Sequence, residues 1–78
     1  MSHQKYFASK NNCIQDLTVA RDAFGNKNTT RKQYAGMLKG LGLMLMYCPE
    51  DIQSLVESTI NEAIVRQIQY ELHIWNDE

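Results

Sequence analysis

From Glu50 to Trp75 the sequence contains neither glycine nor proline, and this uninterrupted stretch constrains the fold more than any other feature. Pro49 suits the first turn of a helix, and Glu50 and Asp51 are favourable near its positively polarised start. Apolar residues then recur three or four positions apart throughout the stretch. The sequence therefore predicts one long helix over about residues 50–75.

The apolar face of this predicted helix is wide. Ile60, Ile64 and Ile68 recur at every fourth position, and such a series drifts round the helix by about 40° per step. A face that approaches half the circumference usually contacts two neighbours. Two shorter helices of the same chain would not cover all of it, so we expect a second subunit to cover the remainder.

A shorter helix is predicted over about residues 11–24. Its apolar positions recur at helical spacing, and Asn11 or Asn12 could cap its first turn. Gly25 follows the last apolar position and is a typical helix stop. The residues expected on its buried face are Ile14, Leu17, Ala20 and Phe24.

Another helix is predicted over about residues 30–47, with Thr29 or Thr30 as its cap. Gly36 and Gly40 are four residues apart and share one face, where they would let another helix approach closely. The alternative is a break over Gly40–Gly42, because each glycine costs about 1 kcal/mol relative to alanine inside a helix.

These elements predict an all-α chain of three helices, because no stretch alternates apolar and polar residues as a half-buried strand does. We expect one small helical domain over residues 1–78, with residues 1–5 mobile. A chain of 78 residues buries a small core and often depends on a partner subunit, so we predict a helical homodimer. The expected subunit contact comprises Gly36, Gly40, Leu41, Ile60, Ile64 and Ile68.

Two cysteines, Cys13 and Cys48, form no CxxC pair, which argues against a zinc site and against a disulfide-rich secreted scaffold. The first residues lack the apolar stretch of a signal peptide, and the longest apolar run, over residues 41–48, is too short to span a membrane. We therefore expect a cytoplasmic protein without membrane contact, whose cysteines are reduced, buried or half-buried structural thiols.

No motif for catalysis or cofactor binding is present. The two histidines, His3 and His73, have no cysteine or carboxylate at metal-ligand spacing. No glycine-rich phosphate-binding motif occurs, and no nucleophile, base and oxyanion group can be assembled. We expect a non-enzymatic protein with no cofactor, no metal and no small-molecule substrate.

Charge is divided along the chain although the net charge is only −1. Residues 1–40 hold seven basic and two acidic residues, whereas residues 41–78 hold one basic and seven acidic residues. One interpretation is that the two halves pack on each other, within one chain or across a dimer. The other is a basic patch for a phosphate backbone or an acidic partner, made of Lys27, Arg31, Lys32 and Lys39.

The order of landmarks resembles that of a known family. The landmarks are Tyr6–Ser9 before the first helix, Gly25–Lys32 before the second, Met37-Leu38 and Leu41 within it, and Glu50-Asp51 at the start of the third. This pattern is similar to the AriR/YmgB and YcgZ group of small enterobacterial connector proteins and covers most of the chain. The resemblance implies an all-helical homodimer without catalytic residues. It also implies a role in biofilm, acid-resistance or envelope-stress regulation, through a protein such as a response regulator and with DNA as a further partner.

Three functions fit these observations. The first is a small non-enzymatic adaptor that is dimeric and binds a regulatory protein. The second is a DNA-binding or nucleoid-associated modulator that uses the basic residues of the N-terminal half. The third is a phage- or plasmid-borne inhibitor of a host protein, which would use the acidic third helix with Glu57, Glu62 and Glu71.

Overall fold

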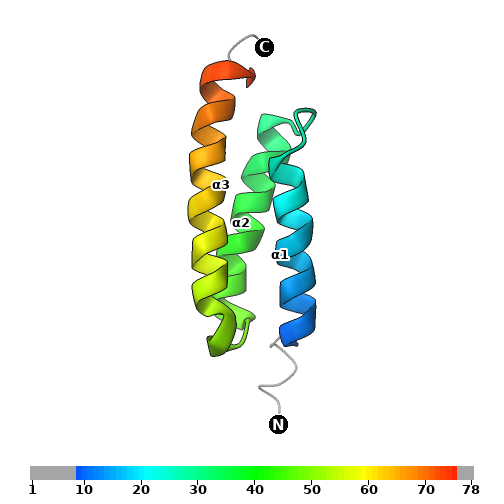
Figure 1. Cartoon of the computed structure of the whole chain (residues 1–78), viewed down its shortest axis with the longest axis vertical. Helices are drawn as coiled ribbons and strands as arrows, with labels where there is room; N and C mark the ends of the chain where they lie inside the picture. Colours follow the sequence, from blue (N-terminus) through cyan, green and yellow to red (C-terminus); the bar gives the residue numbers. More distant parts are fainter. Residues whose placement is uncertain (1–8, 76–78) are drawn as a thin grey trace.

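The computed structural model describes residues 9–75, which form an antiparallel bundle of three helices (Figure 1). Its elements are α1 (Lys10–Phe24), α2 (Arg31–Tyr47), the 3-10 turn η2 (Glu50–Ile52) and α3 (Gln53–His73). The described residues contain no strand, so the all-α, three-helix prediction is confirmed. The stretch expected to be mobile, residues 1–5, lies outside the described part of the chain.

The helix starts follow from local hydrogen bonding. Ser9 caps α1, because its hydroxyl accepts a hydrogen bond from the backbone N–H of Asn12 at 3.1 Å. The predicted caps, Asn11 and Asn12, lie inside the first turn instead. Thr30 caps α2 as expected, and it forms a capping box in which Thr30 and Gln33 satisfy each other's backbone N–H groups at 3.1 and 3.0 Å.

The glycines of α2 neither break the helix nor bring a second helix of the chain close. The helix is continuous from Arg31 to Tyr47, so the predicted alternative of a break is not observed. A methyl group added at Gly36, Gly40 or Gly42 would meet no heavy atom within 4 Å. Any close approach that these glycines allow therefore has to involve another molecule.

One end of the bundle is held by four aromatic side chains. The ring centroids of Tyr34, Tyr70 and Trp75 lie 5.2–5.6 Å apart, and Phe24 stacks on Tyr34 at 5.9 Å. The Trp75 indole N–H donates to the Thr29 carbonyl at 3.0 Å, and the Tyr70 hydroxyl donates to the carbonyl of Phe24. These bonds tie the end of α3 to the α1–α2 turn.

The Tyr34 hydroxyl lies inside this cluster and is a structural group. It is fully buried and donates to the Ala63 carbonyl at 3.0 Å. Burial, with a smaller contribution from Tyr70, raises the pKa of Tyr34 to about 12. The hydroxyl therefore stays protonated beyond the pH at which an exposed tyrosine ionises, and it joins α2 to α3.

The other end of the bundle is held by a disulfide between Cys13 and Cys48, which overturns the prediction of two reduced thiols. Cys13 lies in the first turn of α1 and Cys48 ends α2, with their Cα atoms 6.3 Å apart. Two cysteines that are 35 positions apart can meet because the antiparallel α1–α2 pair brings those ends together. The sequence predicted Ile14 on the buried face of α1. Cys13 is buried there instead, and Ile14 is 38% exposed.

The core lies along the inner face of α3, which packs most extensively against α2 and less against α1. Leu41, which was expected at a subunit contact, is buried here within the single chain. Thr59 is also fully buried, and its hydroxyl donates to the Leu55 carbonyl at 2.8 Å. The buried apolar residues of the middle of the bundle are Leu17, Ala20, Leu41, Met44, Ile52, Val56 and Ala63.

Candidate protein-interaction surface

Four large apolar side chains of α3 face solvent rather than the core. Ile64, Val65, Ile68 and Leu72, here called the α3 stripe, expose between 43% and 63% of their surface. Isolated exposed apolar residues are ordinary, but a cluster of four on two turns of one helix is characteristic of an interaction surface.

The stripe exists because α3 is apolar on opposite sides. Val65 follows Val56 by nine residues, which is two and a half helical turns, so the two valines point in opposite directions. Val56 is fully buried in the core, whereas Val65 is more than half exposed. The stripe also has the 4-3-4 spacing of a helix–helix seam, because Asn61, Val65, Ile68 and Leu72 lie on one line along α3.

The ion pairs of the structure join the two halves of the sequence. Each of the three ion pairs found among residues 9–75 joins a basic residue of the first half to an acidic residue of the second half. This pattern agrees with the interpretation that the halves pack on each other within one chain. The pairs are Lys10–Asp51 at 2.9 Å, Arg21–Glu62 at 3.9 Å and Arg31–Glu71 at 2.6 Å.

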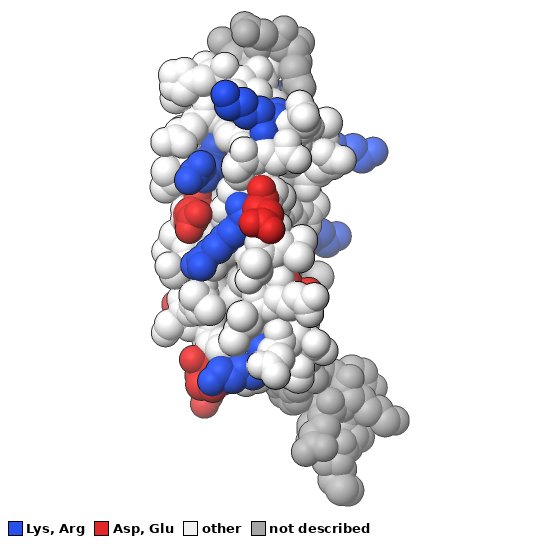
Figure 2. Space-filling view, turned by 45° about the vertical axis from the view of Figure 1, so that its right-hand side comes forward, with Lys and Arg blue, Asp and Glu red and all other residues white. Residues whose placement is uncertain are grey.

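The four basic residues proposed to bind phosphate do not form one free patch. Arg31 donates two hydrogen bonds to the Glu71 carboxylate, at 2.6 and 3.3 Å, and lies 5.5 Å above the Trp75 ring. Lys27 lies in the turn between α1 and α2, while Lys32 and Lys39 are exposed on α2. On the face shown in Figure 2, basic side chains are dispersed along the molecule, with acidic ones beside them at mid-height and near the lower end.

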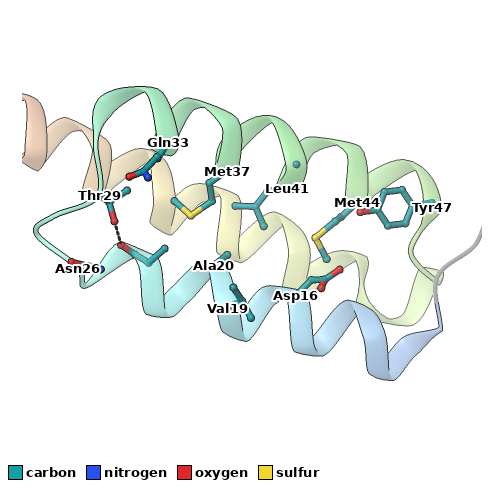
Figure 3. Close-up of a pocket in the computed structure, with 12 residues that line it drawn as sticks. Asp16, Val19, Ala20, Asn26, Thr29, Gln33, Met37, Leu41, Met44 and Tyr47 are labelled. Carbon is teal, nitrogen blue, oxygen red and sulfur yellow. Dashed lines mark hydrogen bonds between the residues drawn. The ribbon is translucent and has the colours of Figure 1, made fainter.

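A groove with a volume of about 630 Å³ runs between α1 and α2 (Figure 3). Its walls are mainly apolar, and Met37, Leu41 and Met44 point from α2 toward α1. Gly40 lies in the α2 wall and leaves room there, because it has no side chain. The lining residues are Asp16, Val19, Ala20, Ala23, Asn26, Thr29, Gln33, Met37, Gly40, Leu41, Met44 and Tyr47.

Most polar groups of the groove are already satisfied. The Thr29 hydroxyl donates to the Ala23 carbonyl at 3.1 Å, and the Asn26 side chain accepts from the Asn28 N–H at 2.9 Å. Gln33 is used in the capping box of α2. Asp16 is the only charged residue in the lining. An apolar, elongated occupant therefore suits the groove better than a polar small molecule, which needs several converging polar groups.

The residues predicted for the subunit contact fall on different parts of the molecule. Gly36 is exposed on α2, and Gly40 lines the groove. Ile60 is half-buried against the core, whereas Ile64 and Ile68 belong to the α3 stripe and do not line the groove. These residues do not form one continuous patch on one chain.

Sequence reasoning missed Val65 and the groove. Val65 lies outside the apolar arc that Ile60, Ile64 and Ile68 define, and its distance of nine residues from Val56 was the available signal. No sequence signal marks the groove, because it depends on how far apart α1 and α2 lie. Among residues 9–75 no cluster of three or more His, Cys, Asp or Glu side chains could hold a metal ion, and no helix there is long and apolar enough to cross a membrane.

Comparison with protein-family models, with curated proteins and with solved structures gives no match to this chain. The resemblance to the AriR/YmgB and YcgZ connectors accordingly stays an expectation.

Proposed function

We propose that this protein is a small non-enzymatic regulatory adaptor that binds another protein through the α3 stripe. The observation that carries the proposal is the exposure of Ile64, Val65, Ile68 and Leu72 on the outer side of α3. The 4-3-4 spacing along this line suits a helix of the partner, laid against α3. The connector resemblance supports the same role, with a response regulator as the kind of partner and homodimerisation as an accompanying property.

The size of the stripe sets what the partner must contribute. Complete burial of such a side chain stabilises by about 1.5–3 kcal/mol, so covering four half-exposed ones contributes about 4 kcal/mol. Association costs about 4–15 kcal/mol in lost freedom of motion. The stripe is therefore the centre of a larger contact that also includes polar groups around it.

The other two functions have less support from the surface. DNA binding was expected to use four basic residues, but Arg31 is held by Glu71 and Trp75, and the three lysines are dispersed. An inhibitor carried by a phage or plasmid was expected to use Glu57, Glu62 and Glu71, but Glu62 and Glu71 already lie in ion pairs with Arg21 and Arg31. The identity of the captured protein separates an inhibitor from an adaptor.

The disulfide bears on the compartment in which the protein acts. Disulfides persist in oxidising compartments and are rare in the cytoplasm. The cytoplasmic location expected from the sequence stays a prediction, and the Cys13–Cys48 bond weighs against it. Blocking free thiols in intact cells before lysis and then counting them tests the prediction directly, because a cytoplasmic protein would carry two reduced thiols.

A capture experiment with matched variants tests the adaptor function. The immobilised full chain is exposed to a nuclease-treated lysate, and the retained proteins are identified by mass spectrometry. Ile68→Glu places a charge in the stripe and should abolish capture of a stoichiometric partner. His73→Glu adds the same charge at an exposed position of α3 about 140° further round the helix, so it should leave capture intact. Equal capture by Ile68→Glu and the unchanged chain would refute the proposal.

A further inference from the structure

The molecule carries two uncovered apolar surfaces of opposite shape, a protruding stripe and a recessed groove. We propose that the α3 stripe of one copy docks into the α1/α2 groove of a second copy, so that chains associate head to tail. This inference rests on the proposed function, because it uses the same stripe. It names the chain itself as a partner for that surface.

The dimensions of the two surfaces match. Groove-lining residues of α2 extend from Gln33 to Tyr47, a length of about 21 Å at 1.5 Å per residue. The stripe extends from Ile64 to Leu72, which is about 12 Å, so it fits within the groove. Gly40 has no side chain, so a docked helix can approach α2 closely there. The methionines of the lining are flexible and can adapt to the branched side chains of the stripe.

The charges beside the two surfaces are complementary. Lys32 and Lys39 are seven residues apart on the exposed side of α2, each about 100° round the helix from a groove-lining residue, Gln33 or Gly40. Glu57 lies seven residues before Ile64, so it is on the side of α3 that carries the stripe. None of these three charged groups makes an ion pair among residues 9–75. Docking brings the Glu57 carboxylate of one copy toward the lysines of the next.

Charge also disfavours the symmetric alternative, in which two stripes pack on each other. In that arrangement the charged residues beside the stripe on both copies would be acidic: Glu57, and Glu71, which is paired with Arg31. Like charges placed opposite each other destabilise a helix pair. The groove offers α2 instead, whose only charged residues are Arg31, Lys32 and Lys39, although Asp16 on the α1 wall is acidic.

A head-to-tail contact has two consequences. Each added copy leaves one stripe free at one end and one groove free at the other, so assembly continues as concentration rises unless the rotation closes a ring. A docked stripe is also covered, so self-association competes with binding of a different protein. The contact places Gly40 of one copy near Ile64 and Ile68 of another, although they lie far apart within one chain.

Two single variants block one surface each. Gly40→Glu fills the groove with a charged side chain, and its backbone tolerates the change because nothing lies within 4 Å of the new Cβ. Ile68→Glu disables the stripe at a residue that is 55% exposed. Gly42→Glu and His73→Glu are the matched controls, because they add a negative charge at exposed positions of the same helices outside the two surfaces.

Sedimentation of the purified full chain, alone and in mixtures, gives the decisive result. The unchanged chain and both controls should increase in mass with concentration, whereas Gly40→Glu and Ile68→Glu alone should stay at the 9.0 kDa of one chain. An equal mixture of the two variants should reach twice that mass and go no further, because it pairs one intact groove with one intact stripe.

Three results would overturn the proposal: an unchanged chain that stays at the mass of one chain at high concentration, a Gly40→Glu variant that self-associates normally, or a mixture that stays at the mass of one chain. The capture experiment separates this failure from failure of the adaptor function. Gly40→Glu should still capture the other partner, because its stripe is intact.

Discussion

Reducing the Cys13–Cys48 disulfide should remove about 4 kcal/mol from the free energy of unfolding. The bond closes a loop of 35 residues, and the chain-entropy relation for a loop of that length gives about 4 kcal/mol at 25 °C. Total stability of a chain of this size is about 4–12 kcal/mol. The disulfide therefore accounts for at least a third of the stability.

Little else holds this end of the bundle: the Lys10–Asp51 ion pair at the start of α1 is more than half exposed, and such pairs contribute little. Cys13 and Cys48 are buried where α1 begins and α2 ends, and the groove separates these helices along their length. The aromatic cluster with Tyr34 and Trp75 holds only the opposite end of the bundle. Reduction should therefore loosen the start of α1 first.

Urea unfolding with and without a phosphine reductant measures the effect. The oxidised chain should be more stable by about 4 kcal/mol, with a transition at higher urea. The Cys13→Ala/Cys48→Ala double variant should have the stability of the reduced chain, and reductant should not change that stability. Two free thiols in the unreduced, unfolded chain, or a reductant effect below about 1 kcal/mol, would refute the reasoning.

Three further predictions concern single side chains. Thr30→Ala removes the capping box of α2 and should cost about 1 kcal/mol in urea unfolding, while Thr18→Ala, an exposed change on α1, should cost less. Tyr34 ionises with a pKa of about 12 when folded and 10.0 when unfolded, so its contribution to stability should be constant below pH 10 and fall by up to about 1.4 kcal/mol per pH unit between pH 10 and 12. Tyr34→Phe should remove this share of the pH dependence, and an unchanged slope would contradict the burial of the hydroxyl. Gly36→Ala should raise stability by about 1 kcal/mol, because the added methyl meets no atom within 4 Å; a loss would show that Gly36 is needed for packing.

Helix positions were predictable to within one to three residues, because they depend on patterns that are local in the sequence. Gly25 and Pro49 delimit the helices, and Thr30 supplies a cap that needs only its own first turn. The predicted cap of α1 was wrong by two or three residues, because Ser9, Asn11 and Asn12 all have side chains that can cap a helix. Side-chain chemistry alone does not choose among neighbouring caps.

The surfaces were predictable only in part. Ile64 and Ile68 were expected at a subunit contact and are exposed. Ile60 and Leu41 were expected at the same contact, but they pack in the core of the single chain. An apolar helix face of this width has to be divided between core and solvent. The division depends on where the neighbouring helices lie, and spacing along one helix does not contain that information.

Local sequence patterns were enough to place three helices and their approximate ends, because hydrophobic periodicity and capping act over a few neighbouring residues. Tertiary structure alone decided the pairing of Cys13 with Cys48, the engagement of Arg31 by Glu71 and Trp75, and the groove between α1 and α2. Each of these features joins residues far apart in the sequence. Their distances are set by how the helices pack, which no local pattern specifies.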